Sequence, residues 1–132
     1  MHLQSEHLTL RPATADDLDD LYRIYGDPAT NTFNPAGPHA DIAYSRQVLA
    51  GWLEHIESYG YGNWAISLRA NPQRIIGFGG IRIVDYPDFT VNNLGYRFSP
   101  EAWGKGLATE FALLAIDYAF NVLKLEDVVG IV

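Results

Sequence analysis

Apolar residues recur along the chain at spacings that predict both helices and strands. Spacings of three and four residues predict a helix after Thr14, a second beginning at Asp41, and a third over about residues 109–123. Gly26 and Gly60 are typical helix-ending residues for the first two. Short alternating or continuous apolar runs predict strands at residues 7–11, 64–68, 75–84, 91–98 and 128–132.

The middle of the chain predicts a β-hairpin whose second strand is rich in glycine. Asn71-Pro72 is expected to make the turn of this hairpin. The returning strand contains three glycines, Gly77, Gly79 and Gly80. Glycine inside a strand indicates a bulge or a close approach by another backbone or a ligand, and tight packing against Trp64 or Trp52 explains it equally well.

For two of the predicted helices the sequence also indicates which surfaces are exposed and which are buried. Asp16-Asp17 and Asp19-Asp20 lie near the positive end of the first helix, and we interpret them as residues of its solvated side rather than as a metal site. The helix over 109–123 is apolar apart from one narrow polar stripe. We therefore expect protein to surround this helix almost completely.

Composition excludes several classes of protein. The 132 residues, 48% apolar, suit one domain spanning 1–132, and no apolar run approaches the ~18 residues of a membrane span. With no secretory signal either, we expect a cytoplasmic protein that binds no membrane. A net charge of −7 argues against nucleic-acid binding; it is compatible with a cationic amine or peptide substrate, or with solubility alone. The chain has no cysteine, and its four histidines share no metal-ligand spacing, so we predict no metal.

The segment from Ser99 to Glu110 joins a predicted strand to the apolar helix through a glycine turn. A helix start leaves backbone N–H groups without partners and is positive, so such a turn can hold an anion. Glycine also serves wherever a turn needs a positive φ, so Gly104-x-Gly106 alone is weak evidence. Neither the Walker A spacing nor the dinucleotide-binding fingerprint fits this register.

The same segment resembles the pyrophosphate loop of the GNAT superfamily of N-acetyltransferases. Its residues 103–108 read Trp-Gly-Lys-Gly-Leu-Ala, with Trp103 in place of the usual Gln or Arg. The resemblance is strongest to the bacterial branch that acetylates ribosomal-protein N termini, and it includes the whole of Gly95 to Glu110. Further matching segments are Leu10-Arg11-Pro12, Ile76-Gly77 and Asp117-Tyr118-Ala119-Phe120.

The resemblance implies an α/β (α+β) fold, with a mixed central sheet flanked by helices. It also implies transfer of an acetyl group from acetyl-coenzyme A (acetyl-CoA) to a primary amine, either a protein N terminus or a small amine, by direct attack. The pyrophosphate would bind the loop that includes Trp103, at backbone amides of Gly104, Lys105, Gly106, Leu107, Ala108 and Thr109. The pantetheine arm would pair with main-chain groups of Tyr96, Arg97, Phe98 and Ser99.

The acceptor site and the general base are harder to identify. By the same resemblance Phe33 and Asn34 lie near the acceptor, although a plain surface loop is an equal alternative. Many relatives have Glu where this chain has Asn93, which can hold a water but cannot act as a base. Tyr96 and Glu101 are the other candidates for proton transfer.

The chain ends at Val132, inside a predicted strand. Family members continue with a further helix and two strands, so we expect a sequence that is incomplete at its C terminus. Two alternatives to an active enzyme therefore stay open. One is a CoA-binding or regulatory module without chemistry, and the other is an inactive piece that self-associates as a homodimer through the edge at 128–132.

Overall fold

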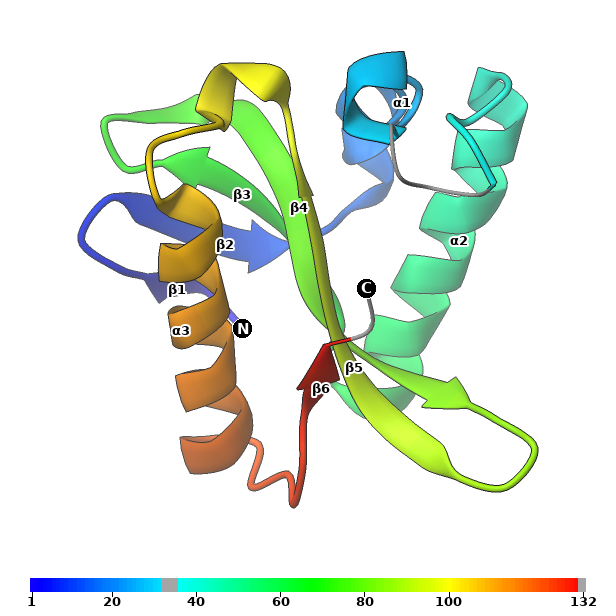
Figure 1. Cartoon of the computed structure of the whole chain (residues 1–132), viewed down its shortest axis with the longest axis vertical. Coiled ribbons are helices and arrows are strands. Elements are labelled where there is room, and N and C mark those ends of the chain that lie inside the picture. The colour runs from blue at the N-terminus through cyan, green and yellow to red at the C-terminus, as the bar shows by residue number, and fades with distance from the viewer. Residues whose placement is uncertain (32–35, 131–132) are drawn as a thin grey trace.

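The computed structural model describes residues 1–31 and 36–130 and contains one six-stranded sheet (Figure 1). The strands lie side by side in chain order: β1 (Leu3–Gln4), β2 (Leu8–Pro12), β3 (Asn63–Leu68), β4 (Asn71–Asp85), β5 (Thr90–Phe98) and β6 (Val129–Gly130). All neighbours are antiparallel except β5 and β6, which are parallel. The predicted mixed sheet is therefore confirmed, with β1 as a strand that the sequence did not indicate.

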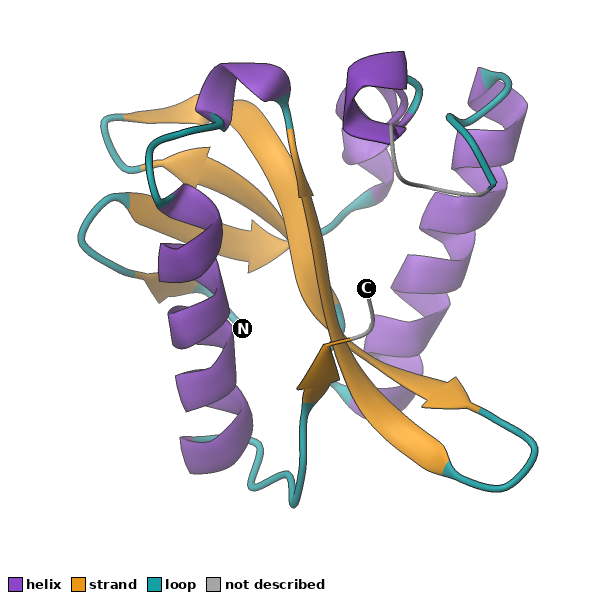
Figure 2. Cartoon of the chain, viewed as in Figure 1, coloured by secondary structure: helices purple, strands orange, loops and turns teal. Residues whose placement is uncertain are grey.

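Helices cover both faces of the sheet (Figure 2). They are α1 (Leu18–Tyr25), α2 (Ile42–Tyr59) and α3 (Leu107–Asn121), with short 3-10 turns η1 (Ala15–Asp17), η2 (Pro28–Asn31) and η3 (Pro100–Ala102). The core on the α3 side includes Trp64, Ile81 and Phe111, and the core on the α1 and α2 side includes Trp52 and Phe78. No helix in the described ranges has the length and apolar character needed to cross a bilayer.

Helix α2 has the ends that the sequence predicts. The Asp41 side chain accepts the backbone N–H of Tyr44 at 2.9 Å, and Gly60 ends the helix with a φ of 78°. A carboxylate at the start and a left-handed glycine at the end satisfy backbone groups that the helix leaves unpaired. Leu49 and Trp52 face the sheet and are buried.

The β3–β4 hairpin turns two residues earlier than expected. Strand β4 begins at Asn71, so the turn is made by residues 69–70 and not by Asn71-Pro72. The first β5 partner of β4 is Gly77, so Pro72 lies where β4 has a neighbour on one side only. Proline is tolerated in such an edge segment because its missing N–H is not needed.

The glycines of β4 allow close approach, as one of the two interpretations predicted. A Cβ at Gly77 would lie 2.7 Å from Phe98, and one at Gly79 would lie 2.8 Å from Phe111. At Gly80 it would overlap the carbonyl oxygen of Gly62. The nearest atoms therefore belong to aromatic side chains, with Tyr96 at 2.7 Å the nearest to Gly79, and to backbone; neither tryptophan considered from the sequence is among the three nearest atoms at any of these positions.

Helix α3 is less enclosed than its composition suggests. Leu107, Phe111, Ala115 and Ala119 are buried at intervals of four residues. Leu113 is 65% exposed, however, and Phe120 is 42% exposed. The expectation of a nearly surrounded helix was wrong, because this helix packs on one face of the sheet and has no described layer outside it.

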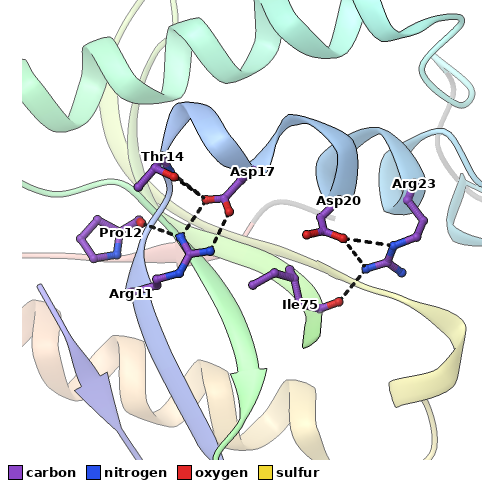
Figure 3. Close-up of polar contacts among 7 residues, drawn as sticks. All are labelled: Arg11, Pro12, Thr14, Asp17, Asp20, Arg23 and Ile75. Carbon is purple, nitrogen blue, oxygen red and sulfur yellow. Dashed lines mark hydrogen bonds and ion pairs between the residues drawn. The ribbon is translucent and has the colours of Figure 1, made fainter. Parts of the chain in front are cut away.

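Asp17 is buried, and the expectation that it lies on the solvated side of a helix was wrong. Its carboxylate accepts two hydrogen bonds from Arg11, at 2.7 and 2.9 Å, and one from the backbone N–H of Thr14 (Figure 3). Arg23 binds Asp20 and the carbonyl of Ile75. These contacts attach the start of α1 to β2 and its end to β4.

Candidate functional site

Strand β5 has an open edge beside the start of α3. On one side β5 pairs with β4 along its whole length, but on the other β6 pairs only with Asn93 and Leu94 in the described chain. Ser99 donates its backbone N–H to Ile76 of β4 at 2.8 Å. Backbone groups in an antiparallel strand alternate between its two edges, so those of Tyr96 point to the open edge.

The turn after β5 is built by two glycines and a tryptophan. Gly104 and Gly106 have φ values of 75° and 74°, which favour glycine, and a Cβ at either position would meet no atom of the described residues within 4 Å. Trp103 donates its ring Nε1–H to the carbonyl of Phe98 at 2.9 Å. The turn therefore keeps its backbone exposed while the tryptophan holds it against the end of β5.

Six consecutive backbone N–H groups of this turn have no protein acceptor. In the part of the chain that the structure describes, the residues from Gly104 to Thr109 donate no backbone hydrogen bond, whereas the N–H of Glu110 reaches the carbonyl of Gly106 at 3.1 Å. Gly106 is the N-cap of α3, so these donors lie where the helix dipole is positive. An anion such as a pyrophosphate would be bound here.

The carboxylate of Glu110 lies in the first turn of α3 but is held away from the loop. It accepts hydrogen bonds from the Ser5 hydroxyl, the backbone N–H of His7 at 2.8 Å, and the His7 ring at 2.7 Å. Burial raises the pKa of Glu110, but the bonds from Ser5 and His7 outweigh it and lower that pKa to about 2. These bonds clamp the start of α3 to the segment between β1 and β2.

A pocket of about 310 Å³ lies on the opposite face of the sheet, between β5 and the helices α1 and α2. Its lining residues are Tyr25, Ala36, Gly37, Pro38, His39, Ala40, Tyr44 and Arg97. The guanidinium carbon of Arg97 lies 4.5 Å from the centre of the Tyr25 ring, and Nη1 donates to Asn31 Oδ1 at 2.9 Å. The pocket thus combines aromatic walls with one cation.

The predicted catalytic residues are not brought together. Asn93 and Tyr96 lie on opposite faces of β5, because Asn93 is opposite Arg82 while the Tyr96 ring contacts Phe111. Glu101 lies beyond the end of β5, in an ion pair with Arg74 at 2.8 Å. The geometry therefore gives no shared proton relay for the three.

The other predicted site residues are located as follows. The backbones of Tyr96, Arg97, Phe98 and Ser99 form the end of β5, and those of residues 103–109 form the turn and first residues of α3. The Lys105 side chain lines a small cavity of about 110 Å³ with Arg74 and Glu101. Phe33 and Asn34 fall outside the described residues. The described ranges contain no group of three metal-ligating side chains.

Sequence reasoning missed the side chain of Arg97. The family resemblance implies only main-chain contacts to the cofactor for this residue, and the sequence indicates no functional role for Tyr25, His39 or Tyr44. A signal was available: side chains alternate along a strand, so Arg97 had to share a face with Asn93, opposite the face of Tyr96 and Phe98.

The family follows from comparison with known proteins. A model described as "Acetyltransferase (GNAT) domain" matches residues 7–132. The chain belongs to the GNAT acetyltransferase family. An uncharacterized N-acetyltransferase, p20, of Bacillus licheniformis is 27% identical over 96% of this chain and 70% of its own length.

Solved structures of acetyltransferases agree with the fold. An acetyltransferase from Agrobacterium tumefaciens is 29% identical, with a TM-score of 0.80 over 98% of this chain and 72% of that chain. The ribosomal-protein-S5-alanine acetyltransferase of Vibrio fischeri has a TM-score of 0.75 at 20% identity, over 98% of this chain and 73% of that chain. The GNAT fold and acetyltransferase class expected from the loop are therefore confirmed, and GNAT enzymes use acetyl-CoA to acetylate amines.

Proposed function

We propose that this GNAT chain binds acetyl-CoA along β5 and transfers its acetyl group to a primary amine entering from the side of α1 and α2. The observation that carries the proposal is the row of six unpaired N–H groups from Gly104 to Thr109, next to the open edge of β5. The row would bind the pyrophosphate, with Lys105 adding charge and Thr109 offering its exposed hydroxyl.

The open edge of β5 would bind the pantetheine arm as an added strand. The outward N–H of Tyr96 is then the donor facing the thioester oxygen, where negative charge develops as the amine attacks. The amine nitrogen would bond to the thioester carbon and the carbon–sulfur bond would break. The leaving thiolate would then take up the proton that the nitrogen loses, so that CoA leaves as the free thiol.

The amine has to approach from the pocket side of β5. On the other side the Tyr96 ring packs against Phe98 and Phe111. Asn93 lies on the pocket side, where it would orient a water that takes the proton of the amine. Glu101 is a weaker candidate as a base, because Arg74 and Arg23 lie 2.8 and 3.7 Å from its carboxylate.

The acceptor proposed from the sequence is a protein N-terminal amine or a small amine. The segment from Gly95 to Glu110 resembles the corresponding segment of enzymes that acetylate ribosomal proteins, and this resemblance supports a protein N-terminal amine. The roles of Phe33 and Asn34, a cytoplasmic location and a homodimer stay predictions.

Calorimetric titration with acetyl-CoA tests the binding site. Gly106→Glu introduces bulk and negative charge at the row of N–H groups and should abolish binding. Gly60→Glu is a matched control, because Gly60 also has a positive φ with open space around it and lies at the far end of α2. Unchanged affinity in Gly106→Glu would contradict the role of the loop.

Release of free thiol distinguishes an enzyme from a CoA-binding module. If the chain is an enzyme, it should release thiol in proportion to acetylated amine when acetyl-CoA and a panel of amines and N-terminal peptides are added. Binding without thiol release from any of these would favour the regulatory alternative, for which Asn93 in place of a carboxylate is the specific observation.

A further inference from the structure

The pocket side of the sheet carries two arginines that have no carboxylate partner among the described residues. Arg97 is opposite Phe78 and Arg82 is opposite Asn93, so both side chains share the face that α1 and α2 cover. Neither forms an ion pair with any residue of the described ranges 1–31 and 36–130. The Arg82 Nε is buried and has no hydrogen-bond partner there. Buried cations are usually paired, whereas these two partly buried arginines, in a chain of net charge −7, have no acidic partner among the described residues.

Arg97 is held in position with most of its donors unused. The Asn31 side-chain N–H groups bind the carbonyls of Tyr25 and Asp27, which orients its oxygen towards Arg97. That single bond is the only hydrogen bond that Arg97 donates from its side chain to the described residues. A guanidinium has five N–H donors, so an oriented fork remains for an anion in the pocket.

The rest of the pocket wall is neutral. Burial raises the pKa of Tyr25 to about 12, so its hydroxyl stays protonated and can donate. Burial also lowers the pKa of His39, and the charge of Arg97 lowers it further, which leaves the ring neutral near pH 7. The carboxylate of Asp41 is occupied as the N-cap of α2 and does not line the pocket.

The spacing along β5 places Arg97 close to the position expected for the reacting amine. Gly95 lies between Asn93 and Arg97 on the same face, and among the described residues a Cβ there would meet only the Asn93 side chain, at 3.6 Å. The part of the chain that the structure describes therefore leaves the face over Gly95 open, beside the edge where the thioester would lie. Residues two apart on a strand are about 7 Å apart, so the long Arg97 side chain lies within reach of an anion a few bonds from an amine held over Gly95.

We propose that the acceptor is a primary amine that also carries a carboxylate, and that Arg97 binds this carboxylate beside Tyr25 and His39. The inference deepens the proposed function, since it names the acceptor class for the same reaction. Arg97 acts as a specificity residue: it binds the carboxylate, and the bond changes at the thioester are those already described.

Rates for matched pairs of amines test the proposal. Acetylation is measured for glycine and glycinamide, for β-alanine and its amide, and for glycylglycine and its amide. The ratio of kcat/KM for acid over amide is compared between wild type and variants, so the intrinsic reactivity of each amine cancels. The variants are Arg97→Gln, Arg97→Lys and the control Arg46→Gln, which removes the same charge from an exposed position of α2.

A charge-assisted, bidentate contact predicts that the ratio falls roughly 10- to 100-fold in Arg97→Gln. In Arg97→Lys the ratio should fall by a smaller factor, because lysine keeps the charge but loses the bidentate geometry of the guanidinium. Arg46→Gln should leave the ratio unchanged. An acid-to-amide ratio that is the same in wild type and Arg97→Gln would overturn the proposal while leaving the acetyltransferase function intact.

A binding experiment keeps the two hypotheses separate. N-acetylglycine and N-acetylglycinamide, which resemble the reaction products, are titrated calorimetrically into protein saturated with CoA. Tighter binding of the acid in wild type, lost in Arg97→Gln, supports the acceptor class even if no turnover occurs. Equal binding of the two compounds by wild type overturns it, whereas failure of acetyl-CoA itself to bind contradicts the proposed function.

Discussion

Replacing Glu110 by Gln should destabilise the domain most between about pH 4.5 and 6.5. The ordinary pKa of 4.5 is lowered to about 2 in the folded protein. At about 1.4 kcal/mol per tenfold change, this corresponds to roughly 3 kcal/mol of stability from the ionised carboxylate. The side chain is 21% exposed, so solvent screening reduces our expectation to about 2 kcal/mol, or roughly 7 °C in Tm for a chain of this length.

The titration of Glu110 sets the lower limit of this pH range, and the titration of His7 sets the upper limit. Because the folded pKa of Glu110 lies below its unfolded value, its contribution is complete above about pH 4.5 and is lost as the pH falls towards 2. The pKa of His7 is raised, chiefly by its hydrogen bond to Glu110. The contribution of His7 is therefore complete below pH 6.5 and is lost as the pH rises through the folded pKa.

Urea denaturation at pH 3, 5.5 and 8 measures the difference in the free energy of unfolding between wild type and Glu110→Gln. Glu54→Gln on α2 is a control for the loss of one exposed carboxylate. Effects of the other histidines are common to both proteins and cancel in the difference. The reasoning is refuted if the two proteins are equally stable at pH 5.5, or if their difference is the same at pH 3 as at pH 5.5.

Three further predictions concern the framework of the site. Asp17→Asn should lower the free energy of unfolding by about 3 kcal/mol, because Arg11 and the N–H of Thr14 lose a buried carboxylate; urea denaturation checks this against the exposed Asp19→Asn. Gly80→Ala should cost about 2 kcal/mol through overlap with the Gly62 carbonyl, and an unchanged Tm would contradict it. Trp103→Phe should cost about 1 kcal/mol and weaken acetyl-CoA binding measured by calorimetry, since the Phe98 carbonyl loses its donor.

The parts of the fold that the sequence predicted are those decided by local chemistry. Asp41 and Gly60 bound α2 because a side-chain acceptor and a positive φ act within one turn of the chain. The glycine turn before α3 was recognisable for the same reason, since unpaired N–H groups at a helix start need no distant partner.

The parts that it missed depend on distant partners. Asp17 is buried because Arg11 of the preceding strand reaches it, and no helical pattern contains that information. The exposure of Leu113 follows from the position of α3 as an outer layer, which composition cannot indicate. Arg97 lines a pocket only because α1 and α2 cover its face of the sheet. Glu101 is less available as a base because two arginines from other elements lie beside it.

The open edge of β5 also has a consequence for how the protein behaves when no cosubstrate is bound. An unpaired strand edge can hydrogen-bond to another chain, and proteins usually protect such edges from aggregation. In the proposed complex the pantetheine arm occupies the outward groups of Tyr96 and removes that opportunity. We therefore expect acetyl-CoA to slow both aggregation on storage and amide exchange at Tyr96, so that the cosubstrate also acts as a protective cover for the sheet.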